Sequence, residues 1–189
     1  MQAQPIRQQA CCYWFTGLPG AGKTTLANYM YQALERQAIK AVVLDGDRLR
    51  QGLNRDLGFS RDDRRENIRR IAEVARLMVD AGLVVLVSAI SPYQEDRQMA
   101  RECFEEGCFF EVFVATSLAV CMERDPKGLY SLAKAGKITH LTGWDAPYET
   151  PDNPEFIIQT TDCPVDKSAE PLVRHALAKA QQFSATGGI

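Results

Sequence analysis

The sequence contains little of what builds metal sites, membrane spans or export signals. Its six cysteines form no C-x-x-C pair, and its two histidines lie far from them and from each other, so no zinc site is expected. No run approaches the roughly 18 apolar residues of a membrane helix, and the polar start of the chain lacks the apolar core of a secretory signal. We therefore expect a cytoplasmic protein without membrane contact, whose thiols are reduced and mostly buried.

An excess of positive charge is also missing. The chain has 22 basic and 24 acidic residues, for a net charge of −2. This balance argues against long nucleic acid as a partner, although a local basic patch can still bind a small anion. The length of 189 residues, with 46% hydrophobic residues, fits one domain with one core.

Short apolar runs alternate with helical patterns along the chain, which predicts an α/β fold with a parallel sheet and helices on both faces. About five strands are expected, at 11–16, 41–44, 83–90, 109–115 and 155–160. Helices are expected at 23–37, 63–81, 93–106, 118–124 and 165–183.

Three of these segments carry further expectations. The run 83–90 is the most apolar, so we expect it to be the central strand. The segment 125–154 is long, irregular and rich in Gly and Pro, which is typical of a lid or binding loop. Residues 184–189 are expected to fray.

A phosphate-binding loop follows the first expected strand. Residues 17–24 read GLPGAGKT and match the pattern G-x-x-x-x-G-K-[ST], which occurs by chance in roughly 1% of chains of this length. Lys23 supplies a charge for the phosphates, and the Thr24 hydroxyl can ligate Mg²⁺. The pattern predicts ATP and Mg²⁺ at Gly17, Leu18, Pro19, Gly20, Ala21, Gly22, Lys23, Thr24 and Thr25. By itself it does not separate a kinase from a GTPase or an ATPase.

Two carboxylates stand at the end of the second expected strand, in Asp45-Gly46-Asp47. Ligands of open α/β sheets bind along the carboxyl edge of the strands. A carboxylate there can take a proton from an attacking hydroxyl or hold Mg²⁺ through water. The other interpretation is a polar turn, because Asp-Gly is common in turns.

A basic segment follows. Arginine suits a bidentate grip on phosphate or sulfate, although several of these side chains are expected on a solvated helix face. Its members are Arg48, Arg50, Arg55, Arg61, Arg64, Arg65, Arg69 and Arg70. Phe59 lies among them and can stack on a base, so the segment predicts a pocket for a second, anionic substrate.

Seven motifs together resemble one known family, the adenylyl-sulfate kinases. They are GLPGAGKTT (17–25), LDGDRLRQGLNRDLGFS (44–60), DRRENIRRIAEVARLM (63–78), VLVSAISPY (85–93), EVFV (111–114), RDPKGLY (124–130) and TGWDAPYETPDNPE (142–155). The resemblance covers about 12–160 in family order. It implies a P-loop kinase fold over the whole chain, a homodimer, and transfer of phosphate from ATP to the 3′-hydroxyl of adenylyl sulfate, giving 3′-phosphoadenylyl sulfate in sulfate assimilation.

The resemblance also implies roles for single residues. Asp47 would lie near the 3′-hydroxyl as base or orienter, and Phe59 would stack on the adenine of adenylyl sulfate. Arg50, Arg64 and Asn67 would hold the phosphosulfate end.

Further site residues follow from the same motifs. Lys127 and the segment up to Tyr148 match the mobile lid, and Asp45, Ile90 and Leu141 are also expected in the substrate site. Ser91 matches a serine that is phosphorylated in some members, and it joins Lys23 and Asp47 as a catalytic candidate. No Lys or His is adjacent to Ser91 in sequence to activate it, and direct transfer needs no carrier, so lining the pocket is the favoured role.

The chain departs from the family pattern at three positions. Arg48 replaces a usual Asn, Pro19 a usual Ser, and Leu141 the second phenylalanine that stacks on the adenine; Trp144 is near enough in sequence to compensate. A sister kinase with another nucleotide or small phosphorylated acceptor is the first alternative. A degenerate, non-enzymatic module is the second, and it is disfavoured because Lys23, Thr24 and Asp47 are all present.

Overall fold

The computed structural model describes residues 9–185. Five parallel strands form one sheet in the order β2-β3-β1-β4-β5. They are β1 (Cys12–Thr16), β2 (Ala41–Asp45), β3 (Val84–Ser88), β4 (Phe109–Val114) and β5 (Phe156–Ile158). The predicted α/β fold with a parallel sheet is confirmed.

The predicted centre of the sheet was wrong. The apolar run 83–90 gives β3, but β1 takes the central place between β3 and β4. All five residues of β1 are fully buried, including a Tyr and a Trp whose bulk exceeds that of the valines in β3. Helices cover both faces of β1 and of β3, so apolar content alone could not decide which of the two is the central strand.

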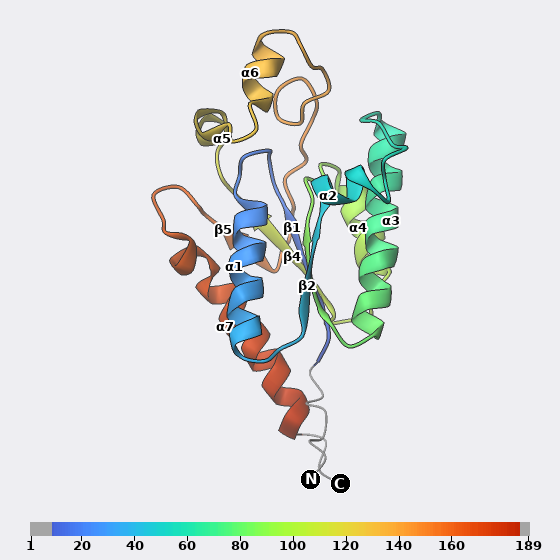
Figure 1. Ribbon diagram of the computed structural model, residues 1–189, viewed down its shortest axis with the longest axis vertical. Helices are drawn as coiled ribbons and strands as arrows, with labels where there is room; N and C mark the ends of the chain where they lie inside the picture. Colours follow the sequence, from blue (N-terminus) through green and yellow to red (C-terminus); the bar gives the residue numbers. More distant parts are fainter. Residues whose placement is uncertain (1–8, 186–189) are drawn as a thin grey trace.

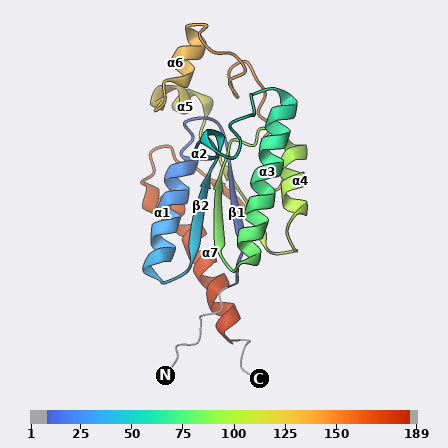
Figure 2. The same ribbon diagram turned by 45° about the vertical axis from the view of Figure 1, so that its right-hand side comes forward.

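Helices cover both faces of the sheet (Figures 1 and 2). On one face lie α1 (Lys23–Arg36) and α7 (Val165–Ala185); on the other lie α3 (Arg61–Asp80) and α4 (Gln94–Glu102). Successive side chains of a strand point to opposite faces. Tyr13 therefore packs with α1 and α7, whereas Trp14 packs with α3 and α4.

Helix ends differ from the sequence-based expectation by a few residues. The last helix, α7, continues to Ala185, so residues 184 and 185 are helical, while 186–189 lie outside the described residues. The helix α4 ends at Glu102, four residues before its expected end. The start of the chain, up to residue 8, is also outside the described part.

Two short helices were not expected. The first, α2 (Gly46–Gln51), begins where the Asp45 carboxylate accepts hydrogen bonds from the backbone N–H groups of Asp47 and Arg48, at 2.9 and 3.2 Å. Such an N-cap stabilises a helix by about 1 kcal/mol. The second, α6 (Leu129–Lys134), follows α5 (Leu118–Arg124) and lies beyond the carboxyl edge of the sheet (Figure 1).

The cysteines between residues 9 and 185 are all free thiols. Cys11, Cys12 and Cys121 are buried, whereas Cys103, Cys108 and Cys163 are partly exposed, so half rather than most of the thiols are buried. No helix in the described range is long and apolar enough to cross a bilayer.

Candidate active site

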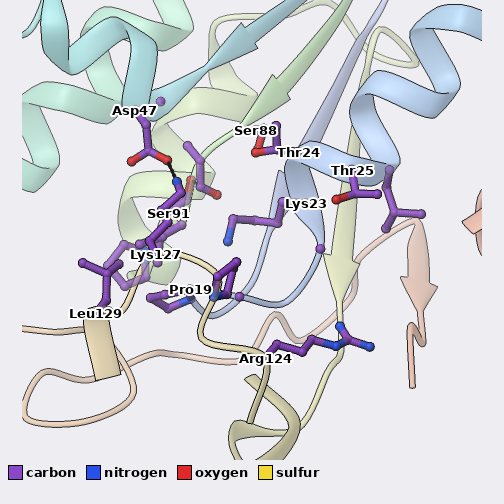
Figure 3. Close-up of a pocket in the computed structure, with 18 of the residues that line it drawn as sticks. Pro19, Lys23, Thr24, Thr25, Asp47, Ser88, Ser91, Arg124, Lys127 and Leu129 are labelled. Atoms are coloured by element: carbon purple, nitrogen blue, oxygen red, sulfur yellow. Dashed lines mark hydrogen bonds and ion pairs between the residues drawn. The ribbon is translucent and has the colours of Figure 1, made fainter. Parts of the chain in front are cut away.

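A cavity of about 660 Å³ opens at the carboxyl edge of the sheet. Five parts of the chain line it: the loop before α1, the region from α2 to the start of α3, the turn after β3, the segment from α5 to α6, and the connection from β5 to α7. Figure 3 shows side chains from these parts facing a common space. The position agrees with the rule that ligands of open α/β sheets bind at this edge.

The glycine-rich loop wraps around the start of α1 as its pattern predicts. Gly17 has a φ of +147°, and a Cβ there would lie 2.7 Å from the carbonyl oxygen of Val114, so a larger residue does not fit. Gly20 has a φ of +79°, and a Cβ there would lie 3.0 Å from the carbonyl oxygen of Cys121. These approaches let the backbone curl into a cradle for phosphate oxygens.

Lys23 lies in the centre of this cradle (Figure 3). Its Nζ donates hydrogen bonds to the carbonyl oxygens of Gly17 and Leu18, at 2.9 and 2.8 Å. Burial lowers the pKa of Lys23 to about 8. A cation held only by neutral carbonyls in a buried position attracts an anion strongly.

Three oxygens from three elements meet beside the loop. The Thr24 hydroxyl donates to Asp45 Oδ2 at 2.8 Å and lies 2.9 Å from Ser88 Oγ. Hydroxyl and carboxylate oxygens are the ligands that Mg²⁺ takes in phosphate sites, where it keeps several waters. The donor set fits Mg²⁺, and Ser88, at the end of β3, is a member that sequence reasoning missed.

Asp47 lies on α2 and forms an ion pair with Lys127, which belongs to the 125–154 segment (Figure 3). Both side chains are more than half exposed, and both residues line the cavity. The pair joins two parts of the chain that are 80 residues apart. It places one carboxylate and one cation at the wall of the cavity.

Six of the eight arginines of the basic segment fall into two groups; the other two, Arg48 and Arg55, are exposed and do not line the cavity. Members of the first group are paired with carboxylates on α3, α4 and the loop before α3: Arg61, Arg65, Arg69 and Arg70. Arg50 and Arg64 line the cavity and form no ion pair with a carboxylate of residues 9–185. Burial lowers the pKa of each, and the charge of Arg64 lowers that of Arg50 further.

Main-chain carbonyls hold these two arginines beside Phe59. Arg50 Nη1 donates to the carbonyl of Gly58 at 2.9 Å, and Arg64 Nε donates to that of Phe59 at 3.0 Å. Their guanidinium carbons lie 4.5 and 5.6 Å from the centre of the Phe59 ring. The ring is 56% exposed and lines the cavity, so its free face is available to a planar group.

Asn67 completes this side of the cavity from α3. Its Oδ1 accepts a hydrogen bond from Asn54 Nδ2 at 3.0 Å. Both side chains are buried. The bond leaves the amide N–H₂ group of Asn67 as a donor for an anionic ligand.

Ser91 is 1% exposed although it lines the cavity. Its Oγ accepts a hydrogen bond from Trp14 Nε1 at 2.8 Å, and its carbonyl accepts one from Arg97 Nη1, also at 2.8 Å. The residue has a φ of +47°, which these contacts help to fix. An indole N–H is a donor and cannot accept the proton of the serine hydroxyl.

Leu141 does not line the cavity. It is 7% exposed and belongs to the apolar cluster on the α1–α7 side of the sheet. Trp144, three residues after Leu141, is 44% exposed. A stacking role for Leu141 stays a prediction, and Leu141 does not line the cavity in this structure.

The cavity also contains residues to which the sequence assigned no role. They come from the end of α5 and from the connection between β5 and α7, and include Arg124, Thr160, Cys163 and Val165. Arg124 donates to Thr160 Oγ1 at 2.8 Å and to its carbonyl at 2.7 Å, which fixes the guanidinium plane at the cavity wall. Arg124 begins the motif RDPKGLY, which is the one sequence signal that pointed to it.

Most of the predicted site residues meet in this cavity. Those that line it are Pro19, Gly20, Gly22, Lys23, Thr24, Thr25, Asp47, Arg50, Phe59, Arg64, Asn67, Ile90, Ser91 and Lys127. Gly17, Leu18, Ala21, Asp45 and Leu141 do not line it. Of these, Gly17 and Leu18 contact Lys23, and Asp45 contacts Thr24.

Comparisons with known proteins agree with this geometry. The model of the adenylylsulphate kinase family matches residues 9–159. The probable adenylyl-sulfate kinase of Bacillus subtilis is 51% identical over 87% of this chain and 83% of its own length. The adenylyl-sulfate kinase of Geotalea uraniireducens is 51% identical over 93% of this chain and 82% of its own.

A solved structure is similar throughout. The APS kinase CysC of Mycobacterium tuberculosis, in complex with AMPPNP and APS, superposes with a TM-score of 0.86 at 47% identity. The match covers 90% of this chain and 99% of that one.

Proposed function

The chain belongs to the adenylyl-sulfate kinase family, and we propose that this cavity transfers the γ-phosphate of ATP to the 3′-hydroxyl of adenylyl sulfate. The observation that carries the proposal is the pair of arginines, the partly buried Arg50 and the buried Arg64, that line the cavity and have no carboxylate partner among residues 9–185. Beside them Phe59 offers an open ring face. An anion joined to a planar base satisfies both groups.

ATP binds with its phosphates in the glycine-rich loop. Lys23 exchanges its bonds to two carbonyls for bonds to phosphate oxygens, and the backbone N–H groups of the loop donate to the others. The adenine of ATP lies at the opposite wall, against Arg124, Cys163 and Val165. The planar guanidinium of an arginine and apolar side chains can both pack on the face of a base.

Thr24, Asp45 and Ser88 would hold Mg²⁺. When bound, Mg²⁺ neutralises charge on the phosphates of ATP. Asp45 Oδ2 and Ser88 Oγ already lie within hydrogen-bond distance of the Thr24 hydroxyl, which supports a shared ligand there.

Asp47 orients the 3′-hydroxyl of the acceptor and takes its proton as the new P–O bond forms. The γ-phosphoryl group leaves the β-phosphate of ATP, which departs as ADP. Lys127, paired with Asp47 before substrates bind, is free to move toward the phosphates when the 125–154 segment closes as a lid. Charge on the transferred group is thereby met by Lys23 from one side and Lys127 from the other.

We also infer a domain organisation, an oligomeric state and a cellular location. The chain acts as a single kinase domain with a lid at about 125–154, it forms a homodimer, and it works in the cytoplasm. The dimer rests on the family, and the cytoplasm on the free thiols at all six cysteines.

A panel of acceptors tests the proposed activity. ADP release would be measured in a coupled assay with adenylyl sulfate, AMP, adenosine and a small phosphorylated sugar. We expect adenylyl sulfate to give the highest kcat/KM by a wide margin. A higher kcat/KM with another acceptor would favour the sister-kinase alternative. The departure at the buried Leu141 would then be a feature of a kinase with that other acceptor.

The pKa of Lys23 predicts how ATP affinity depends on pH. The pKa is about 8 in the free site, and bound phosphate raises it because the charged form is favoured beside an anion. The protonated form binds, so ATP affinity should be constant below about pH 8 and should fall about tenfold per pH unit above it. Calorimetry with ATP and Mg²⁺ between about pH 7 and about pH 9.5 measures this.

The matched control for that titration is Lys23→Arg, whose guanidinium stays protonated over the whole range. The ATP affinity of this variant should be weaker than that of the parent. It should not fall above about pH 8, because the charge at position 23 does not change there. An ATP affinity of the parent that is equal at both ends of the range would contradict the assigned pKa.

Ser91→Ala should retain activity within about tenfold of the parent, because Ser91 lines the pocket and carries no phosphate. The variant leaves the buried Trp14 N–H without its acceptor, so we expect a loss of about 1–3 kcal/mol in the free energy of unfolding. Kinetics and thermal unfolding of the same preparation separate the two effects. Complete loss of turnover together with a labelled phosphoenzyme in the parent would reverse the assignment.

A further inference from the structure

The segment 140–146, which we call the 140–146 turn, is held together by hydrogen bonds to the Asp145 side chain and to the Leu141 carbonyl. The Asp145 carboxylate accepts from the backbone N–H groups of His140 and Leu141, at 2.8 and 2.6 Å. The carbonyl of Leu141 in turn accepts from the N–H groups of Trp144, Asp145 and Ala146 at 3.0 to 3.2 Å. The turn is therefore one compact unit, and Asp145 is the side chain that closes it.

His140 has a backbone conformation that needs support. Its φ is +61°, in a region that residues other than glycine seldom adopt. The side chain of His140 is exposed, so packing does not impose this conformation. The two hydrogen bonds to Asp145, one at His140 and one at the next residue, hold it instead.

The turn reaches the cavity through one carbonyl. Arg64 Nη2 donates to the carbonyl oxygen of His140 at 2.6 Å, while Nε of the same guanidinium donates to the carbonyl of Phe59 at 3.0 Å. Arg64 is 7% exposed and lines the cavity. The two carbonyls fix the plane of the guanidinium, which leaves Nη1 as the donor for an anion.

Charge adds to the geometry. Burial lowers the pKa of Arg64, whereas the negative charge of Asp145 acts in the opposite direction. Asp145 itself does not line the cavity, and its carboxylate oxygens accept hydrogen bonds from the backbone of the turn. A carboxylate in that place favours the charged arginine without competing for the ligand.

We propose that Asp145 is a positioning residue for the acceptor: it holds the 140–146 turn so that the His140 carbonyl fixes Arg64 toward the anionic group of adenylyl sulfate. This deepens the proposed function and rests on it. Because Asp145 acts on the acceptor side alone, removing its carboxylate should weaken the acceptor and spare ATP.

Steady-state kinetics of Asp145→Ala test the proposal. We expect the KM for adenylyl sulfate to rise about tenfold, with kcat and the KM for ATP within about twofold of the parent. Asp145→Asn keeps one carbonyl oxygen and should give a rise of about threefold. Asp62→Ala is the matched control: it removes an exposed carboxylate from the first turn of α3, outside the cavity lining, so the KM for adenylyl sulfate should change by less than about twofold.

A double-mutant cycle with Arg64→Ala decides whether Asp145 acts through Arg64. In the Arg64→Ala background, adding Asp145→Ala should raise the KM for adenylyl sulfate by less than about twofold. An equal rise in both backgrounds, an equal rise in the KM for ATP, or no rise in the single variant would each overturn the proposal. Turnover of adenylyl sulfate by the parent tests the proposed function separately, because the positioning role is judged from ratios between variants.

Discussion

Lys23→Ala should lower turnover by about 10³-fold or more while the chain still folds. Phosphoryl transfer is catalysed mostly by positioning and by neutralising charge, and Lys23 is the cation in the centre of the phosphate cradle. The measurement is kcat at saturating ATP and adenylyl sulfate, with thermal unfolding to confirm the fold.

The control for this variant is Lys134→Ala, which removes an exposed lysine of α6 and should leave kcat within about twofold. Activity of Lys23→Ala within tenfold of the parent would show that the glycine-rich loop has been given the wrong role.

Asp47→Asn should lower kcat by about 10²–10⁴-fold and change the KM for adenylyl sulfate much less. A carboxylate that takes or orients the proton of the attacking hydroxyl acts mainly in the transition state. The amide of Asn has nearly the same shape and can still accept from Lys127, so the lid contact survives. Initial rates over a range of both substrates separate kcat from KM.

Asp62→Asn, on the exposed first turn of α3, is the control and should be indistinguishable from the parent. Asp45→Asn keeps the cap on α2, since Asn caps as well as Asp, but weakens the oxygen cluster at Thr24. If Asp45→Asn abolishes turnover and Asp47→Asn is mild, the proton acceptor has been placed on the wrong carboxylate.

Much of the fold could be predicted because its signals are local. The alternation of apolar runs with 3.6-residue periodicity gave the strands and the large helices, and the glycine-rich pattern placed the phosphate cradle between β1 and α1. The short helices α2 and α6 were missed because helices of six residues carry too little periodicity to detect. The place of β1 at the centre depends on strand order, which no local pattern encodes.

The candidate site divides in the same way. Motif residues such as Lys23, Asp47 and Arg64 meet in one cavity because they follow the carboxyl ends of parallel strands. Arg124, Thr160 and Cys163 come together only through tertiary packing, and their spacing in sequence forms no pattern. The pairing of α3 arginines with carboxylates, which sets Arg50 and Arg64 apart, also depends on side chains from α4.

Identification of the product tests the proposed reaction most directly. The chain would be incubated with ATP, Mg²⁺ and adenylyl sulfate, and the nucleotide products would be separated and assigned by ³¹P NMR. We expect equal amounts of ADP and of adenylyl sulfate that carries one new phosphate on its 3′-oxygen. Release of ADP without a new nucleotide, or a phosphate on any other oxygen, would contradict the proposed function.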